Sequence, residues 1–226
     1  MKSTILFVLM QWISSVLRRG VQKLHFYIRE HVFVSSHSLF CCNSLVELKI
    51  QAPCTLRVPG SHFVPNLKII ILHEVKFLND SFPHSEELFL SFPVLKAFEC
   101  INCTWLNAQY VSIETPQLES FGIEYLNTSL FHCTSKFRIC SLHLTKFSYA
   151  GYLSENIILL EPSSILVASI LIPCLKACML LAQLCKVEGL HLQLYMIQAH
   201  KRGRHFASLP TFEKLIYLEL DSYFQL

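Results

Sequence analysis

A pattern of three apolar positions recurs nine times along the 226-residue chain. Each copy has one apolar anchor, a second three residues later, and a third two residues after that. The copies are Val21-Leu24-Phe26, Leu45-Leu48-Ile50, Leu67-Ile70-Leu72, Leu95-Phe98-Cys100, Leu118-Phe121-Ile123, Leu144-Phe147-Tyr149, Ile165-Ala168-Ile170, Val187-Leu190-Leu192 and Leu215-Leu218-Leu220. Successive first anchors lie 21 to 28 residues apart. A period in this range is typical of a repeat architecture in which each unit forms one turn of a stack.

The spacing inside each copy predicts a short strand, because two residues separated by one lie on the same strand face. Each unit buries that face only by stacking on its neighbours, so nine strands should form one parallel sheet. We therefore predict an α/β leucine-rich-repeat solenoid, a curved parallel sheet of about nine short strands with loop or short-helix returns. Helical returns are expected at Ser85–Leu90 and Cys174–Leu184. Residues 1–20 form an N-terminal apolar segment leading into the first repeat, and residues 21–226 form the repeat domain.

A C-x-x-C pair at Cys100 and Cys103 raises the question of a metal or redox site. In the repeat pattern L-x-x-L-x-L-x-x-N/C, Cys100 fills the last inward strand position and Cys103 the position that takes Asn or Cys. A zinc site needs a second ligand pair. The other close cysteine pairs are spaced by seven and by four, namely Cys133/Cys140 and Cys174/Cys178. We predict that the C-x-x-C pair is structural and that the chain binds no metal or other cofactor.

The charge and cysteine content narrow the class of protein. The formal net charge of +3 is spread along the chain, and the one basic cluster, residues 201–204, is interpreted as a solvated loop. We therefore expect no nucleic-acid partner. The ten cysteines are irregularly spaced and mostly flanked by aliphatic residues, which favours reduced, buried thiols. A cytoplasmic or nuclear location follows, and the sequons at Asn79, Asn102 and Asn127 matter only in the secretory pathway.

Two apolar stretches were weighed as membrane signals. Residues 1–17 resemble a weak signal peptide, but Arg18-Arg19 follows where a small-residue cleavage site is expected. Residues 165–185 are long enough to span a bilayer, yet Lys176 lies mid-span and Pro173 interrupts a helix there. The sequence does not favour either membrane interpretation.

Catalytic chemistry finds little support. His132-Cys133 and the pair Cys140 and His143 are the candidates for a Cys/His nucleophile. The repeat register makes them turn and strand residues. Phosphate-binding glycine loops, H-E-x-x-H and G-x-S-x-G do not occur in the sequence. We predict that the chain is not an enzyme.

Binding is the function that the repeat architecture favours, because the outward strand residues of a solenoid line its concave face. Ile69, Ile71 and Ile101 stand out there, since adjacent outward apolar side chains form a patch that soluble monomers usually avoid. We predict an unidentified protein partner on this face. The candidate partner-binding residues are Lys49, Ile69, Ile71, His73, Glu99, Ile101, Glu124, Lys146, His191, Tyr217 and Glu219.

Six blocks, in order, resemble the repeat region of plant F-box/LRR proteins of the FBD type. They are WISSVLRRGVQKLHF (12–26), SLFCCNSLVELKI (38–50), VPNLKIIILHEVKFLND (64–80), FPVLKAFECINCTWL (92–106), LTKFSYAGYL (144–153) and LPTFEKLIYLEL (209–220). In that family an N-terminal F-box binds the Skp-type adaptor of a cullin ubiquitin ligase, and the repeats present the substrate-binding surface. The resemblance implies a protein–protein interaction scaffold like the substrate-recognition repeats of such a ligase subunit.

The chain departs from the family pattern at both ends. Eleven residues precede the Trp12 block and none resembles an F-box, so we expect no Skp-type adaptor binding. The chain stops at Leu226, where many relatives begin an FBD-type segment, which predicts a repeat domain truncated at its C-terminus. The alternative is a secreted or membrane-anchored leucine-rich-repeat binding protein, which glycosylation at Asn79, Asn102 or Asn127 would favour.

Overall fold

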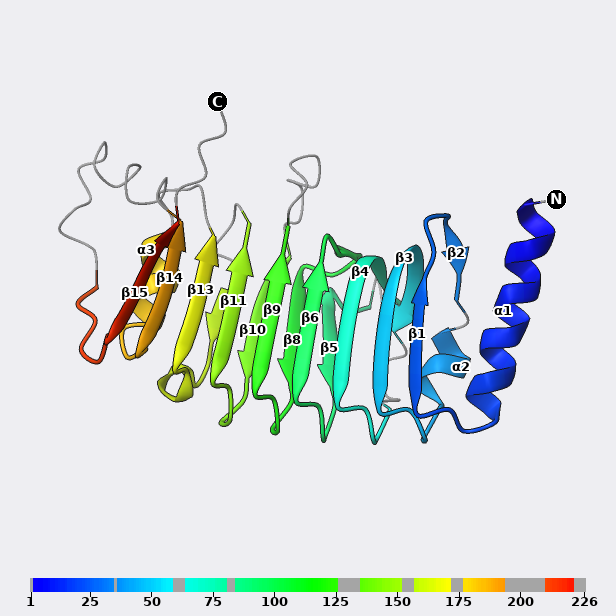
Figure 1. The fold of residues 1–226 in the computed structure, drawn as a ribbon, viewed down its shortest axis with the longest axis horizontal. Helices are drawn as coiled ribbons and strands as arrows, with labels where there is room; N and C mark the ends of the chain where they lie inside the picture. The colour runs from blue at the N-terminus through cyan, green and yellow to red at the C-terminus, as the bar shows by residue number, and fades with distance from the viewer. Residues whose placement is uncertain are drawn as a thin grey trace, which may run out of the picture.

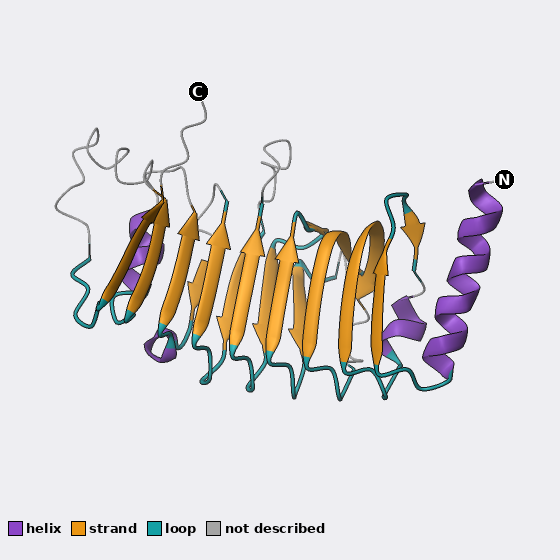
Figure 2. Ribbon diagram, viewed as in Figure 1, coloured by secondary structure: helices purple, strands orange, loops and turns teal. Residues whose placement is uncertain are grey.

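The computed structural model describes residues 2–34, 36–58, 64–80, 84–125, 135–151, 157–171, 177–193 and 210–221. Within these ranges the fold is a leucine-rich-repeat solenoid built mainly from parallel strands (Figures 1 and 2). The helical elements are α1 (Lys2–Arg18), α2 (Ser36–Phe40), η3 (Pro162–Ser164) and α3 (Ala177–Gln183).

Nine strands run side by side in one large parallel sheet. They are β1 (Lys23–Tyr27), β3 (Glu47–Val58), β4 (Ile69–Asn79), β6 (Ala97–Ile101), β9 (Ser120–Glu124), β11 (Lys146–Ala150), β13 (Val167–Leu171), β14 (Gly189–Gln193) and β15 (Tyr217–Asp221). Each carries one of the nine copies of the apolar pattern, and the copies are paired in register from Leu24↔Leu48 to Leu192↔Leu220. The predicted fold class and strand positions are confirmed.

Two inward columns of side chains hold the large sheet to the core. In the centre of the sheet the rings of Phe98 and Phe121 are 5.6 Å apart and those of Phe121 and Phe147 are 6.0 Å apart. All three rings are almost fully buried. Parallel repeats place equivalent side chains above one another, so the aromatic rings pack in near-parallel planes. The columns loosen at β15, where Leu218 and Leu220 are about half exposed.

The returning segments differ from the prediction. Four strands form a second parallel sheet behind the large one, of which β10, β8 and β5 are labelled in Figure 1. Their order is β12 (Ile157–Leu159), β10 (Lys136–Cys140), β8 (Tyr110–Glu114) and β5 (Glu87–Ser91). The helix expected at Ser85–Leu90 is wrong, because Leu88 and Leu90 alternate with exposed or half-exposed residues along β5 and pack inward as strand residues. The helix expected at Cys174–Leu184 is confirmed by α3 over its described part.

The first turns of the solenoid contain longer strands. Pro53 cannot donate to a sheet, and the β3–β4 pairing shifts register between Gln51 and Cys54. Pairing then resumes from Cys54↔Val75 to Val58↔Asn79. The C-terminal halves of β3 and β4 each pair with one further short strand. The strand β2 (Val32–Phe33) pairs with β3, and β7 (Thr104–Leu106) pairs with β4.

Helix α1 covers the first end of the stack (Figure 1). Ile13 and Leu17 lie one turn apart and are buried against the core, while Trp12 is largely exposed. Gly20 ends the helix with a φ of 83°, which lets the amide of Val21 donate to the carbonyl oxygen of Val16. The N-terminal apolar segment is thus an amphipathic helix.

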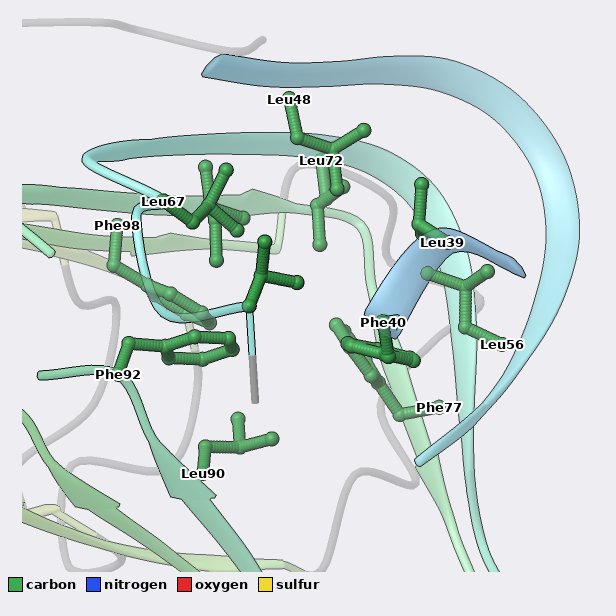
Figure 3. A pocket seen from close by; sticks show the side chains of 12 residues that line it. Leu39, Phe40, Leu48, Leu56, Leu67, Leu72, Phe77, Leu90, Phe92 and Phe98 are labelled. Carbon is green, nitrogen blue, oxygen red and sulfur yellow. The ribbon is translucent and has the colours of Figure 1, made fainter. Parts of the chain in front are cut away.

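The interior between the sheets is closely packed. A void of about 20 Å³ lies there, lined only by apolar side chains from α2 and both sheets, among them Leu39, Leu72 and Phe98 (Figure 3). This volume is close to that of a single water molecule, and an apolar cavity stays dry. The void belongs to the core and offers no ligand site.

Candidate functional site: the outer face of the large sheet

The face of the large sheet that points away from the core carries three rows of side chains, and we call it the outer face. The rows come from the first, third and fifth positions of the nine repeat strands. The first row is Lys23, Glu47, Ile69, Ala97, Ser120, Lys146, Val167, Gly189 and Tyr217. The second is His25, Lys49, Ile71, Glu99, Gly122, Ser148, Ser169, His191 and Glu219. The third is Tyr27, Gln51, His73, Ile101, Glu124, Ala150, Leu171, Gln193 and Asp221.

All eleven residues that the sequence predicted as partner-binding therefore lie on one face, in neighbouring rows. Lys146, Tyr217 and Glu219 are exposed and the other eight are half-buried. Glu47 and Ser169 also lie on this face and are not among the eleven predicted partner-binding residues. Only their cross-strand contacts distinguish them from ordinary solvated strand residues.

The first section of the outer face is an ion-pair network centred on Glu47. Its carboxylate lies 2.8 Å from the Lys49 ammonium, 3.1 Å from His25 Nε2 and 3.3 Å from the Lys23 ammonium. The hydrogen bond from Lys49 is the main reason that the pKa of Glu47 falls to about 2, although burial opposes the shift. The same bond raises the pKa of Lys49. The charge of the Glu47 carboxylate is therefore neutralised by basic side chains of the same sheet.

The middle section combines isoleucines with carboxylates. Ile71 on β4 is paired directly with Glu99 on β6, and Ile101 on β6 is paired with Glu124 on β9. Burial raises the pKa of Glu124, the nearby charge of Glu99 raises it further, and His73 opposes both effects. Within the described residues neither carboxylate has a salt-bridge partner within 4 Å. This section differs from the Glu47 network because its carboxylates form no salt bridge among the described residues, although Lys49 acts electrostatically on Glu99 and His73 on Glu124.

A groove of about 500 Å³ opens beside the middle section, at the carboxyl ends of the first strands. It is lined by Tyr27, Ile28, Arg29, Gln51, His73, Glu74 and Asn102. Glu74 has a φ of 60° and lies within β4, at the register shift opposite Gln51–Cys54. Asn102 has a φ of 51° and follows β6 directly. Both residues occupy the left-handed region, which is uncommon for side chains other than glycine and turns the chain sharply at the groove edge. His73 belongs to both the groove and the outer face.

The last section contains a chain of hydrogen bonds across three strands. Ser169 Oγ lies 3.2 Å from His191 Nδ1, and His191 Nε2 lies 3.2 Å from an Asp221 carboxylate oxygen. The order of groups matches a hydrolase triad, but that chemistry also needs N–H donors aimed at the oxyanion. The strand β13 pairs with β11 on one side and β14 on the other, so its amides lie in the sheet plane. The geometry supports a fixed imidazole and not a nucleophilic serine.

The C-x-x-C pair lies inside the stack and not on the outer face. Cys100 and Cys103 are each 1% exposed, and the Cys103 thiol donates to the carbonyl oxygen of Leu72 in the preceding turn, at 3.4 Å. Burial and the neighbouring Cys103 raise the pKa of the Cys100 thiol well above its usual range. The predicted inward positions of both residues are confirmed. Cys133 and Cys174 lie outside the described residues.

The described part of the chain shows neither a metal-binding cluster nor a membrane-spanning helix. Over the described ranges, no group of three or more His, Cys, Asp or Glu side chains is arranged to hold a metal ion. The helices in those same ranges are all too short or too polar to cross a membrane. Residues 167–171, within the second stretch weighed as a span, form the strand β13. The basic cluster at 201–204 lies outside the described residues.

Comparison with known proteins identifies relatives. The chain is 29% identical to an F-box/FBD/LRR-repeat protein of Arabidopsis thaliana over 94% of its own length and 48% of the relative. It is 32% identical to an Arabidopsis F-box protein over 64% of the chain and 29% of that protein. An Arabidopsis F-box/LRR-repeat protein is 26% identical over 51% of the chain and 30% of its own length.

The chain is similar in sequence to plant F-box/LRR-repeat proteins. This confirms the resemblance seen in the six sequence blocks. The chain spans about half the length of the first of these relatives, and less of the others. No protein-family model matches the chain, and no solved structure matches it.

Proposed function

We propose that the outer face of the large sheet binds a protein, and that the chain is the recognition part of an F-box-type ubiquitin-ligase receptor. The observation that carries the proposal is the position of Ile71 and Ile101, which lie in adjacent rows at the centre of a continuous nine-stranded face. Apolar side chains held half-exposed on a sheet are a common feature of interaction surfaces. Adaptor binding through an F-box is a family property and forms no part of this proposal.

Several observations support an intracellular, non-catalytic role. The buried thiols and the names of the relatives fit a receptor of the cytoplasm or nucleus. Glycosylation at Asn79 would require its side-chain nitrogen, which is buried and donates to the carbonyl oxygens of Ser85 and Asn107 at 2.9 and 3.1 Å. The secreted alternative therefore loses one of its three acceptor sites in the folded chain.

The test compares the wild-type chain with Ile71→Asp and with a matched control, Ile158→Asp. Ile158 is an exposed isoleucine on β12 in the small sheet, so its substitution places the same charge on the opposite side of the solenoid. Proximity labelling in plant cells should give a set of proteins that Ile71→Asp loses and Ile158→Asp retains. Circular dichroism should show that both variants fold. An identical set of labelled proteins from all three chains would refute binding at the outer face.

A further inference from the structure

The outer face divides into two electrostatic halves. The strands β1 and β3 present two lysines around Glu47, and these charges contact one another. From β6 to β15 the same face presents four carboxylates and a single lysine, Lys146. The carboxylates are Glu99, Glu124, Glu219 and Asp221. A partner lying across the second half meets a negative surface, so its own contacting residues must be basic or neutral.

Two of these carboxylates are placed where they can act together with the isoleucines. Direct pairing puts Glu99 beside Ile71 and Glu124 beside Ile101, so each acidic side chain has an apolar neighbour on the preceding strand. A partner that covers the isoleucines also removes water from the adjacent carboxylates. Burying a carboxylate without a partner is costly, whereas a basic group supplied by the ligand forms a charge-assisted hydrogen bond.

Gly122 lies between these groups without opening a pocket. It is the second-row residue of β9, paired with Glu99 on one side and Ser148 on the other. It is buried, and a methyl group at this glycine would lie 2.7 Å from Ser148 Oγ and 3.6 Å from the Glu99 side chain. The Ser148 hydroxyl therefore covers the glycine, and the surface beside Glu99 is formed by a small polar side chain.

We infer that the outer face recognises a protein segment carrying a lysine or arginine next to an aliphatic or aromatic residue. The apolar residue packs on Ile71 and Ile101, and the basic residue lies between Glu99 and Glu124. This inference rests on the proposed function and names the class of segment that the same site takes. The charge on this half of the face disfavours an acidic segment or a nucleic acid.

A peptide-display selection against the full 226-residue chain tests the inference. The variants are Glu99→Gln/Glu124→Gln, Ile71→Asp, and the control Glu114→Gln, which removes an exposed carboxylate from β8 in the small sheet. The expected peptides place Lys or Arg within two residues of an apolar side chain. The synthesised lead peptide should bind the double glutamine variant about 10-fold or more weakly, as for the loss of a charge-assisted hydrogen bond, with a smaller salt dependence. Glu114→Gln should bind as the wild type does.

The outcomes separate this inference from the proposed function. Peptides that Ile71→Asp loses but the double glutamine variant retains would overturn the basic-segment inference and leave binding at the outer face standing. Enrichment of acidic peptides at the same site would also overturn the basic-segment inference and leave binding at the outer face standing. Peptides that bind every variant equally would overturn both. A selection that yields no peptide dependent on Glu99 and Glu124 counts against the inference.

Discussion

The inward and outward residues of the nine strands obey different rules although they alternate along the same backbone. Inward positions repeat almost unchanged, because each unit packs on the next and a stack of equivalent side chains fills the core. Outward positions change from strand to strand, from the ion pairs around Glu47 to the isoleucines and then to Glu124. Fold stability therefore limits which residues can occupy the inward positions. The outward positions can vary, and they can determine which partner is bound.

The largest effect should come from breaking an inward column. Phe121→Ala removes the central ring of the Phe98–Phe121–Phe147 stack and leaves a cavity, at a cost of about 3–5 kcal/mol. For a chain of this size the melting temperature should fall by roughly 10 °C. Phe89→Ala is the control, since Phe89 is 48% exposed on β5. Equal destabilisation by both variants, measured by thermal unfolding, would show that the inward column is not the stabilising element.

A smaller loss of stability is expected from substituting Glu47, the outward residue with the most ion-pair contacts to its neighbours. Glu47→Gln weakens the contacts with Lys23, His25 and Lys49 and should lower the melting temperature at neutral pH by about 3 °C. The exposed pair Lys96–Glu119 supplies the control, because Glu119→Gln should change stability very little.

The difference in stability between wild type and Glu47→Gln should depend on pH, and this dependence gives a second test of the ion pairs. The pKa of Glu47 is lowered from 4.5 to about 2, so the folded state binds protons less readily than the unfolded state. Its stabilisation is complete above pH 4.5 and is lost as the pH falls through about 2. The gap in stability between wild type and Glu47→Gln should therefore close over that range. A gap that is the same at both ends of the range would exclude the proposed charge network.

The smallest stability effect, of opposite sign, is expected at Glu124. Burial and Glu99 raise the pKa of this carboxyl, so the ionised form is less favourable in the folded chain than in the unfolded chain. Glu124→Gln should be slightly more stable than the wild type at neutral pH, by a few tenths of a degree to about 2 °C. The difference should vanish below the unfolded pKa, because both side chains are then neutral. A variant less stable than wild type at pH 7 would show that Glu124 is neutralised within the sheet, as Glu47 is.

The sequence anticipated the inward half of this protein in detail. The positions of the nine repeat strands in the large sheet followed from the apolar pattern, as did the buried places of Cys100 and Cys103. The resemblance to plant F-box/LRR proteins also followed from the repeat blocks. These features could be recognised because stacking demands the same side-chain type at the same position in each unit, and such regularity is visible in one dimension.

The tertiary structure decided what lies between and across those positions. The second sheet was missed because its strands, such as Glu87–Ser91, are short and separated by irregular returns without a shared period. The sequence likewise placed Glu47 and Glu124 on the same face but could not show that lysines neutralise one carboxylate while burial and a like charge act on the other. Lys49 is two residues from Glu47, but Lys23 is 24 residues from Glu47 and Glu99 is 25 residues from Glu124, and those pairs meet only through the parallel register. The local pattern thus determined the stack, and the contacts between units determined how its outer charges are arranged.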